Sequence, residues 1–407
     1  MNPILRRLVS LSLPCCLLGP LAAQDAKADA QRLAACCNQF AADLYQRLGK
    51  TATPTSGPAS VAFALLMLTP GARAATADEL ATVLHLPTDL RGARLDAAVQ
   101  KLLATCGLGA RPGANEKTAM RLVNAMWAQR GHAFVPAYVA TLRSSYGATH
   151  HLVDFIHATE GARRAINDDV ASATNDRIKE LIPPDLLTAE TRLVLTNAMW
   201  FKGAWQHAFA ERRTKPEPFT RADGSEVTVS MMQLGEALPG VDGEAWIAVE
   251  LPFTDSEVRC EIVMPKAGHT LAEAEQAMLQ DAVRPALQQQ QVSLRLPKFR
   301  VAAQHRLKEA LIALGLPRAF TADADFSGID DKEPLCIDEV VHQSWIQLDE
   351  AGAEAAAATA VVMKRAGAAR DFIKLTFDHP FAFALRDHGT GLLLFAGRVD
   401  DPSQAAR

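Results

Sequence analysis

The sequence lacks the short motifs that mark common classes of enzyme. It contains no Gly-x-Ser-x-Gly nucleophile elbow, no His-Glu-x-x-His zinc motif and no Walker loop. The pair His150–His151 has no third ligand at a suitable spacing, so we expect two ordinary histidines there. We therefore expect no catalytic residue, no metal ion and no cofactor. A hydrolase that uses His342 as a general base stays open as an alternative.

The sequence also has little charge bias and few cysteines. A net charge of −4 over 407 residues argues neither for nor against a nucleic-acid or membrane partner. The basic residues are scattered and form no dense patch for a polyanion, so we expect neither partner. Two of the seven cysteines, Cys15 and Cys16, lie near the N-terminus, and the other five are an odd number. At least one thiol should then be free, which argues against a disulfide scaffold.

The first 23 residues have the pattern of a secretory signal. Arg6–Arg7 precede an apolar stretch, Leu8–Leu21, that is too short to span a bilayer comfortably. Leu21-Ala22-Ala23 is a suitable cleavage site, so residues 1–23 are predicted to be removed and 24–32 to form a short linker. The protein is then expected outside the cell or in the periplasm. An unremoved membrane anchor is the alternative.

The rest of the chain is globular in composition, with ample apolar content, and its length alone suggests two or three domains. Leu122–Trp127 and Leu195–Trp200 repeat the pattern Leu-x-Asn-Ala-Met-Trp. Two apolar strands on one core could look alike by chance, so the repeat does not establish a duplication. Thr76 and Glu79 have the spacing of a capping box and predict a helix that starts at Thr76.

The stretch from Ser344 to Arg370 fits two structures. It begins as a strand-like alternation, passes through Asp349, Glu350 and Gly352, and continues as a run of side chains no larger than threonine. Local propensity favours a surface helix capped by Asp349. The competing interpretation is an extended segment able to enter a β-sheet, because every second residue from Ala353 to Val361 is small and uncharged and would face one side.

Several motifs, in the right order, resemble those of the serpin family. Glu350-Ala-Gly352-Ala353-Glu354, followed by four alanines and Thr359, resembles the proximal hinge of a serpin reactive-centre loop. Phe201–Trp205 after Asn197, and the two C-terminal segments Phe377–Phe383 and Leu394–Val399, are also similar to the family. The resemblance implies a single α+β domain over residues 33–403. This domain would have three β-sheets, eight or nine helices and an exposed loop at about 350–372, and its source is expected to be bacterial.

The resemblance implies that the protein is a suicide-substrate inhibitor of secreted serine proteases and is not itself an enzyme. A protease attacks the loop, and the cut segment inserts as a new central strand. Family spacing from Glu350 puts the scissile bond at Ala366–Gly367, which implies an elastase-like target. Arg365–Ala366, for a trypsin-like target, and Lys364–Arg365 are the alternatives. Cysteine proteases are further possible targets, and a monomer is expected. The other function class is a non-inhibitory serpin acting as a carrier, chaperone or storage protein.

The resemblance also implies two groups of site residues. The hinge comprises Glu350, Gly352, Ala353, Glu354, Ala355, Ala356, Ala357, Ala358 and Thr359. The shutter and breach, which control opening of the central sheet, comprise Ser60, Asn197, Trp205, Lys298 and His342. Lys298 is expected to pair with Glu350, and His342 to lie near Ser60 and Asn197. Gly57 stands where the family usually has a serine.

Overall fold

The strands of the chain form two hydrogen-bonded sheets. A computed structural model describes residues 20–49, 56–108, 118–353 and 372–403. The first sheet has the strand order β2 (Thr149–Val153), β1 (Thr118–Gln129), β3 (Leu193–Ala204), β11 (Gly352–Ala353), β10 (Glu339–Leu348) and β9 (Phe299–Arg306). The second has the order β12 (Ile373–Thr376), β8 (Gln288–Pro297), β5 (Glu226–Asp242), β6 (Trp246–Pro252), β7 (Val258–Pro265), β13 (Phe381–Asp387) and β14 (Leu393–Val399), with β4 (Lys215–Thr220) paired to β5.

Three sheets were predicted, and the described residues form two because β5 is long. Its 17 residues pair with β4 and β8 along most of their length and with β6 at the far end. One strand thus joins what would otherwise be separate sheets. The α+β class and the single domain are confirmed.

Eight α-helices lie in the described part of the chain. They are α1 (Pro20–Leu48), α2 (Pro58–Leu66), α3 (Ala74–Val83), α4 (Gly92–Thr105), α5 (Pro136–Thr141), α6 (Thr159–Ala173), α7 (Leu271–Leu279) and α8 (Lys308–Ala313). Short helical turns add η1 (Leu142–Tyr146), η2 (Glu211–Arg213), η3 (Arg284–Ala286) and η4 (Arg318–Phe320).

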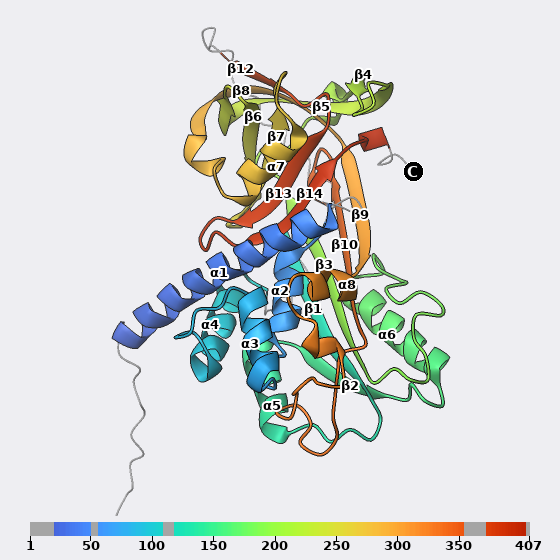
Figure 1. The fold of residues 1–407 in the computed structure, drawn as a ribbon. Helices are drawn as coiled ribbons and strands as arrows, with labels where there is room; N and C mark the ends of the chain where they lie inside the picture. Colours follow the sequence, from blue (N-terminus) through green and yellow to red (C-terminus); the bar gives the residue numbers. More distant parts are fainter. Residues whose placement is uncertain (1–19, 50–55, 109–117, 354–371, 404–407) are drawn as a thin grey trace, which may run out of the picture.

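The helices cover both faces of the first sheet. Every residue of α2 is buried, as its almost wholly apolar sequence requires, and α2 packs against β1 and β3. On the opposite face, Ile166 and Val170 of α6 pack against Val194 and Ala198 of β3. Figure 1 shows the second sheet with α7 at one end of the molecule and the first sheet running from it past α6. The seam between β3 and β10 therefore lies between two packed layers.

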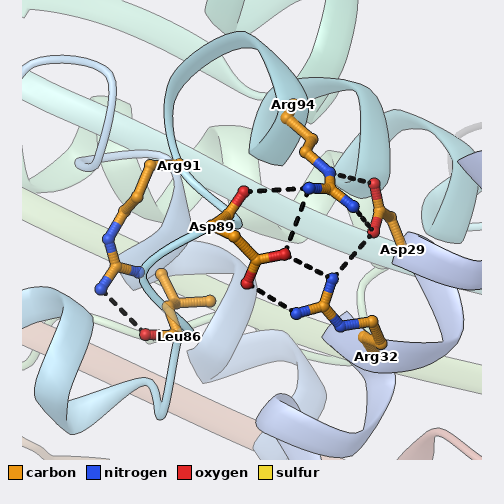
Figure 2. Close-up of polar contacts among 6 residues, drawn as sticks. All are labelled: Asp29, Arg32, Leu86, Asp89, Arg91 and Arg94. Carbon is orange, nitrogen blue, oxygen red and sulfur yellow. Dashed lines mark hydrogen bonds and ion pairs between the residues drawn. The ribbon is translucent and has the colours of Figure 1, made fainter.

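An ionic cluster fastens the N-terminal part of α1 to the body. Arg94 of α4 donates two hydrogen bonds to the buried Asp29, at 2.6 and 2.8 Å, and Arg32 bridges Asp29 to Asp89 (Figure 2). These Arg94 hydrogen bonds lower the pKa of Asp29 below its usual value, although burial opposes them. Nearby, Arg91 donates to the Leu86 carbonyl oxygen. The cluster holds α1 against α4.

Two local predictions for the N-terminal half are wrong. Residues 24–32 lie inside α1 and form no linker, because this alanine-rich segment buries Ala30 and is held by Asp29. α3 begins at Ala74, so Thr76 and Glu79 do not cap it. The removal of residues 1–23 stays a prediction, and residues 1–19 lie outside the described ranges.

Candidate functional site

A two-residue strand lies between β3 and β10 at one end of the first sheet. β3 and β10 pair directly and in parallel from Val194–Glu339 to Trp200–Trp345. Beyond that point β11 enters between them, with Ala353 opposite both Gly203 of β3 and Leu348 of β10. Ala353 is fully buried on the side of the main core. The chain after β10 thus reverses and starts a new central strand.

Gly352 permits this reversal because its backbone has φ +144°. A Cβ at this position would meet the Gly203 carbonyl oxygen and would lie 2.8 Å from Ala204 Cα. Gly203 is constrained by other neighbours, because a Cβ there would lie 2.7 Å from Phe253 Cδ1. Gly352 is therefore needed for the close approach of β11 to β3, whereas Gly203 leaves room for the rings of Phe253 and Phe201.

The turn before β11 is fixed by Asp349 and Trp205. The Asp349 carboxylate accepts hydrogen bonds from the backbone N–H groups of Ala351 and Gly352, at 2.9 and 3.3 Å. The indole N–H of Trp205 donates a hydrogen bond to the backbone carbonyl oxygen of Asp349, at 2.9 Å. Its backbone N–H donates one to the backbone carbonyl oxygen of Ala351, also at 2.9 Å. The ring of Trp205 stacks on that of Phe253, with 4.5 Å between the ring centroids. Burial raises the pKa of Asp349, against the opposing effect of its backbone donors.

Glu350 is held at the same place by two donors. Lys298 Nζ lies 2.6 Å from Glu350 Oε2, and the Thr214 hydroxyl donates to Oε1 at 2.7 Å. Burial alone would raise the pKa of Glu350, but the hydrogen bonds from Lys298 and Thr214 outweigh it and lower the pKa. Glu350 is therefore a charged residue held in place at the start of the predicted hinge.

Deeper in the seam, a buried polar network crosses from β10 to α2. The ring of His342 accepts a hydrogen bond at Nε2 from the backbone N–H of Gly57, at 2.9 Å, and bonds through Nδ1 to Asn197 Oδ1. Asn197 donates in turn to the Ser60 carbonyl, at 2.6 Å, and to Asn124 Oδ1. The network ties the two strands of the seam to the layer beneath them.

His342 is neutral in this network. Burial, followed by the neighbouring ring of His305, lowers the pKa of His342 to about 3. With Nε2 accepting from Gly57, Nδ1 carries the proton and donates to Asn197. Because both ring nitrogens are engaged in structural contacts in a fully buried position, the residue is poorly placed to act as a general base on a substrate.

The structure brings the predicted site residues together in two groups. Lys298, Trp205, Glu350, Gly352 and Ala353 lie at the end of the sheet, and Ser60, Asn197 and His342 lie deeper in the seam. Glu354, Ala355, Ala356, Ala357, Ala358, Thr359 and the bonds at Lys364–Gly367 lie outside the described residues.

Four further residues supply hydrogen bonds to the two groups: Asn124, Gly57, Thr214 and Asp349. Sequence reasoning placed Gly57 and Asp349 in other roles and missed Asn124 and Thr214. A signal existed for Asn124, because it occupies the same place as Asn197 in the repeated motif and the two are direct partners across β1 and β3. Ser60 takes part through its backbone carbonyl, and its own hydroxyl has no hydrogen-bond partner among the described residues.

Metal binding, membrane spanning and disulfide bonding can each be checked in the described residues. They contain no group of three or more His, Cys, Asp or Glu side chains that could hold a metal ion. No helix in the described ranges is long and apolar enough to cross a membrane. The five cysteines in this part of the chain, Cys36, Cys37, Cys106, Cys260 and Cys336, carry free thiols.

Comparison with known proteins supplies the family. A profile described as "Serpin (serine protease inhibitor)" matches residues 35–402. The chain belongs to the serpin family. Serpins typically inhibit serine proteases and are not themselves enzymes in the catalytic sense.

Relatives of this serpin come from distant organisms. It is 36% identical, over 90% of this chain and 84% of the relative, to an uncharacterised serpin-like protein of Thermococcus kodakarensis. It is 32% identical to the leukocyte elastase inhibitor of Sus scrofa, over 91% of this chain and all of that protein.

Solved structures agree on the fold. A highly specific serpin of the insect Tenebrio molitor superposes with a TM-score of 0.80 at 28% identity, covering 91% of this chain and 98% of that one. Human thyroxine-binding globulin in complex with thyroxine has a TM-score of 0.82 at 23% identity, over 92% and 99% of the two chains. The second likeness concerns the fold alone.

Proposed function

We propose that this serpin is a suicide-substrate inhibitor of secreted serine proteases. The protease cuts the chain after β11 and becomes linked to it as an acyl-enzyme. The cut segment then inserts between β3 and β10 and carries the protease away before water can hydrolyse the ester. The observation that carries the proposal is β11 itself, in which Gly352–Ala353 pair with both strands of the seam.

The residue types after β11 suit such an insertion. At about 3.3 Å per residue, residues 352–366 would span roughly 50 Å as a strand. Each hydrogen bond gained on both sides contributes about 1 kcal/mol net. Continued pairing would turn Ala355, Ala357 and Thr359 to the core side with Ala353, and none of these side chains is large or charged.

The target class follows from the scissile bond. Family spacing from Glu350 gives Ala366–Gly367 and a protease that prefers small residues, as elastase does. Arg365–Ala366 is the second candidate and would give a trypsin-like target. The leader pattern in residues 1–23 supports a location outside the cell or in the periplasm, where such proteases act.

The test is to incubate the purified protein, without residues 1–23, with pancreatic elastase and separately with trypsin. An SDS-stable adduct on a denaturing gel supports inhibition, and mass spectrometry of the released peptide identifies the bond. A peptide starting at Gly367 supports Ala366, and one starting at Ala366 supports Arg365.

Cleavage without an adduct would indicate that this serpin does not inhibit these two proteases. The thermal unfolding midpoint of the cut protein then decides whether insertion occurs. A midpoint well above that of the intact protein is expected from the added strand. Cleavage with no adduct and no rise in midpoint would overturn the proposal.

A further inference from the structure

The seam between β3 and β10 carries one pair of large side chains. Trp200 on β3 stands directly opposite Trp345 on β10. The two indoles pack against each other as a separate buried pair, with only 5% and 7% of their surface exposed. They form the last direct pair of the seam before β11 enters. They therefore lie where the two strands would first have to part.

This pair is the bulkiest contact across the seam on its face of the sheet. Side chains alternate along a strand, so Trp200 shares a face with Ala198, and Trp345 with Val341. Ala198 and Val341 pack against α6, which identifies this face as the α6 side. The remaining seam residues on this face are smaller than tryptophan: Val194, Thr196 and Ala198 on β3, and Glu339, Val341 and Gln343 on β10.

Two cations hold the ring of Trp345 from different elements. The guanidinium carbon of Arg177, in the segment after α6, lies 5.6 Å from the ring centroid. That of Arg300 on β9 lies at 5.8 Å. Both distances are within the range of attractive cation–π contact. Trp345 is thus fixed by β9 on one side, by Trp200 on the other and by the segment after α6.

We propose that Trp200 and Trp345 form a latch that sets how readily β3 separates from β10. The latch then governs how much protease is trapped and how much is released after the loop is cut. This inference rests on the proposed function, since it concerns the insertion step. The two tryptophans are positioning residues in it, because neither touches the protease or the reacting bond.

The register of β11 shows which form of the protein the tryptophan contact stabilises. Ala353 is opposite Gly203 and Leu348, so an antiparallel strand that continued in this register would bring position 356 opposite Trp200 and Trp345 together. Neighbouring strands are about 4.8 Å apart, so insertion would move β3 and β10 to roughly 10 Å from each other. The indole contact would be lost, and the methyl group of Ala356 would lie between the rings. The contact therefore stabilises only the form without the inserted strand.

The experiment uses Trp200→Phe, Trp345→Phe and the double variant, with Trp246→Phe on β6 of the second sheet as the matched control. Each protein is mixed with whichever protease cuts the loop, and covalent adduct and free cut inhibitor are quantified on a gel. We expect the seam variants to raise the ratio of adduct to cut inhibitor by roughly fivefold, which corresponds to about 1 kcal/mol of lost contact. The control should match the wild type.

A second readout separates the latch from a merely structural role. In the intact protein, the shifts in thermal unfolding midpoint of the two single variants should not add up to that of the double variant. In the loop-cleaved protein, the midpoint shifts of the two single variants should add up to that of the double variant. Arg177→Gln combined with Arg300→Gln weakens the latch with both indoles retained, and serves if a tryptophan variant does not fold.

The outcomes distinguish the two proposals. A wild-type protein that forms no adduct and gains no thermal stability on cleavage overturns the proposed function, and the latch with it. The latch alone is overturned by a different result: the wild type traps protease, the seam variants trap the same fraction, and the non-additivity of the unfolding midpoints is the same before and after cleavage.

Discussion

Lys298 and Glu350 form an ion pair of 2.6 Å beside the entry point of β11, and Thr214 donates to the other oxygen of the same carboxylate. Glu350 is the first residue of the predicted hinge, and its backbone carbonyl oxygen also accepts a hydrogen bond from the Phe209 N–H at 2.9 Å. The start of the hinge is therefore fixed by both its side chain and its backbone.

Replacing Glu350 with Gln should lower the free energy of unfolding by about 1 kcal/mol at neutral pH, a modest value because Lys298 is partly exposed and water screens the pair. The pKa of Glu350 is lower in the folded protein, so its contribution is complete above the unfolded pKa near 4.3 and is lost as the pH falls through the folded pKa. Denaturant unfolding at pH 7 and pH 3 measures this. Lys298→Met in a double-mutant cycle is the control. A stability difference that persists unchanged at pH 3 contradicts the assignment.

Gly352→Ala should detach β11 from β3, because a Cβ would collide with Gly203 and the positive φ is unfavourable for alanine. We expect a destabilisation of about 1–3 kcal/mol and faster digestion of the hinge by a non-target protease. Gly224→Ala is the matched control, since Gly224 also has positive φ, of +81°, but no atom within 4 Å of an added Cβ. Equal effects of the two substitutions would show that backbone strain, and not the close approach to β3, is responsible.

Under the proposed mechanism, Ala353→Arg should convert this serpin from an inhibitor into a substrate. Ala353 is fully buried between Gly203 and Leu348, and an unpaired charge there carries a desolvation cost of several kcal/mol. The variant should be cut at the normal rate, yet form little SDS-stable adduct. Ala353→Ser, which is small and uncharged, should keep most of the adduct. A normal yield of adduct from the arginine variant would refute the insertion mechanism.

The stability of the protein should fall below about pH 6.5 because of His342. Its pKa is about 3 when folded, so the unfolded chain binds an extra proton between these values. Stability is complete above the unfolded pKa and falls by up to about 1.4 kcal/mol per pH unit as the pH decreases toward the folded value. His342→Gln should be less stable at pH 7, through lost hydrogen bonds, but should have a shallower pH dependence. Parallel curves for the two proteins, measured by denaturant unfolding from pH 7 to 4.5, would contradict this.

The repeated motif and one family-derived pairing can both be followed in the structure. Leu122–Trp127 and Leu195–Trp200 lie on neighbouring antiparallel strands, and their asparagines are direct partners. The pairing of Lys298 with Glu350 is also present. In both cases the residue types leave few other arrangements, since an apolar strand needs a sheet and a buried carboxylate needs a cation.

Predictions from local propensity failed where distant segments intervene. Thr76 accepts a hydrogen bond from Asp325 N–H and Glu79 accepts one from Arg318 N–H, so neither is available to cap α3. The same cause decides part of the stretch after β10. Helix propensity favours a helix from Asp349, yet Gly352–Ala353 are a strand because β3 and β10 supply partners on both sides. No local pattern contains those partners.

Strand β11 has a kinetic meaning as well as a structural one. The costly part of ordering a chain is the first contact, and each later residue adds bonds for little further loss of freedom. With Ala353 paired on both sides, that nucleus exists in the intact protein, so growth can propagate in one direction and in one register. The effect of an unfavourable substitution on insertion should then depend on how far its residue lies from Ala353. A substitution next to Ala353 blocks the pairing of all later residues, whereas the same substitution near the far end weakens the pairing of only the last few.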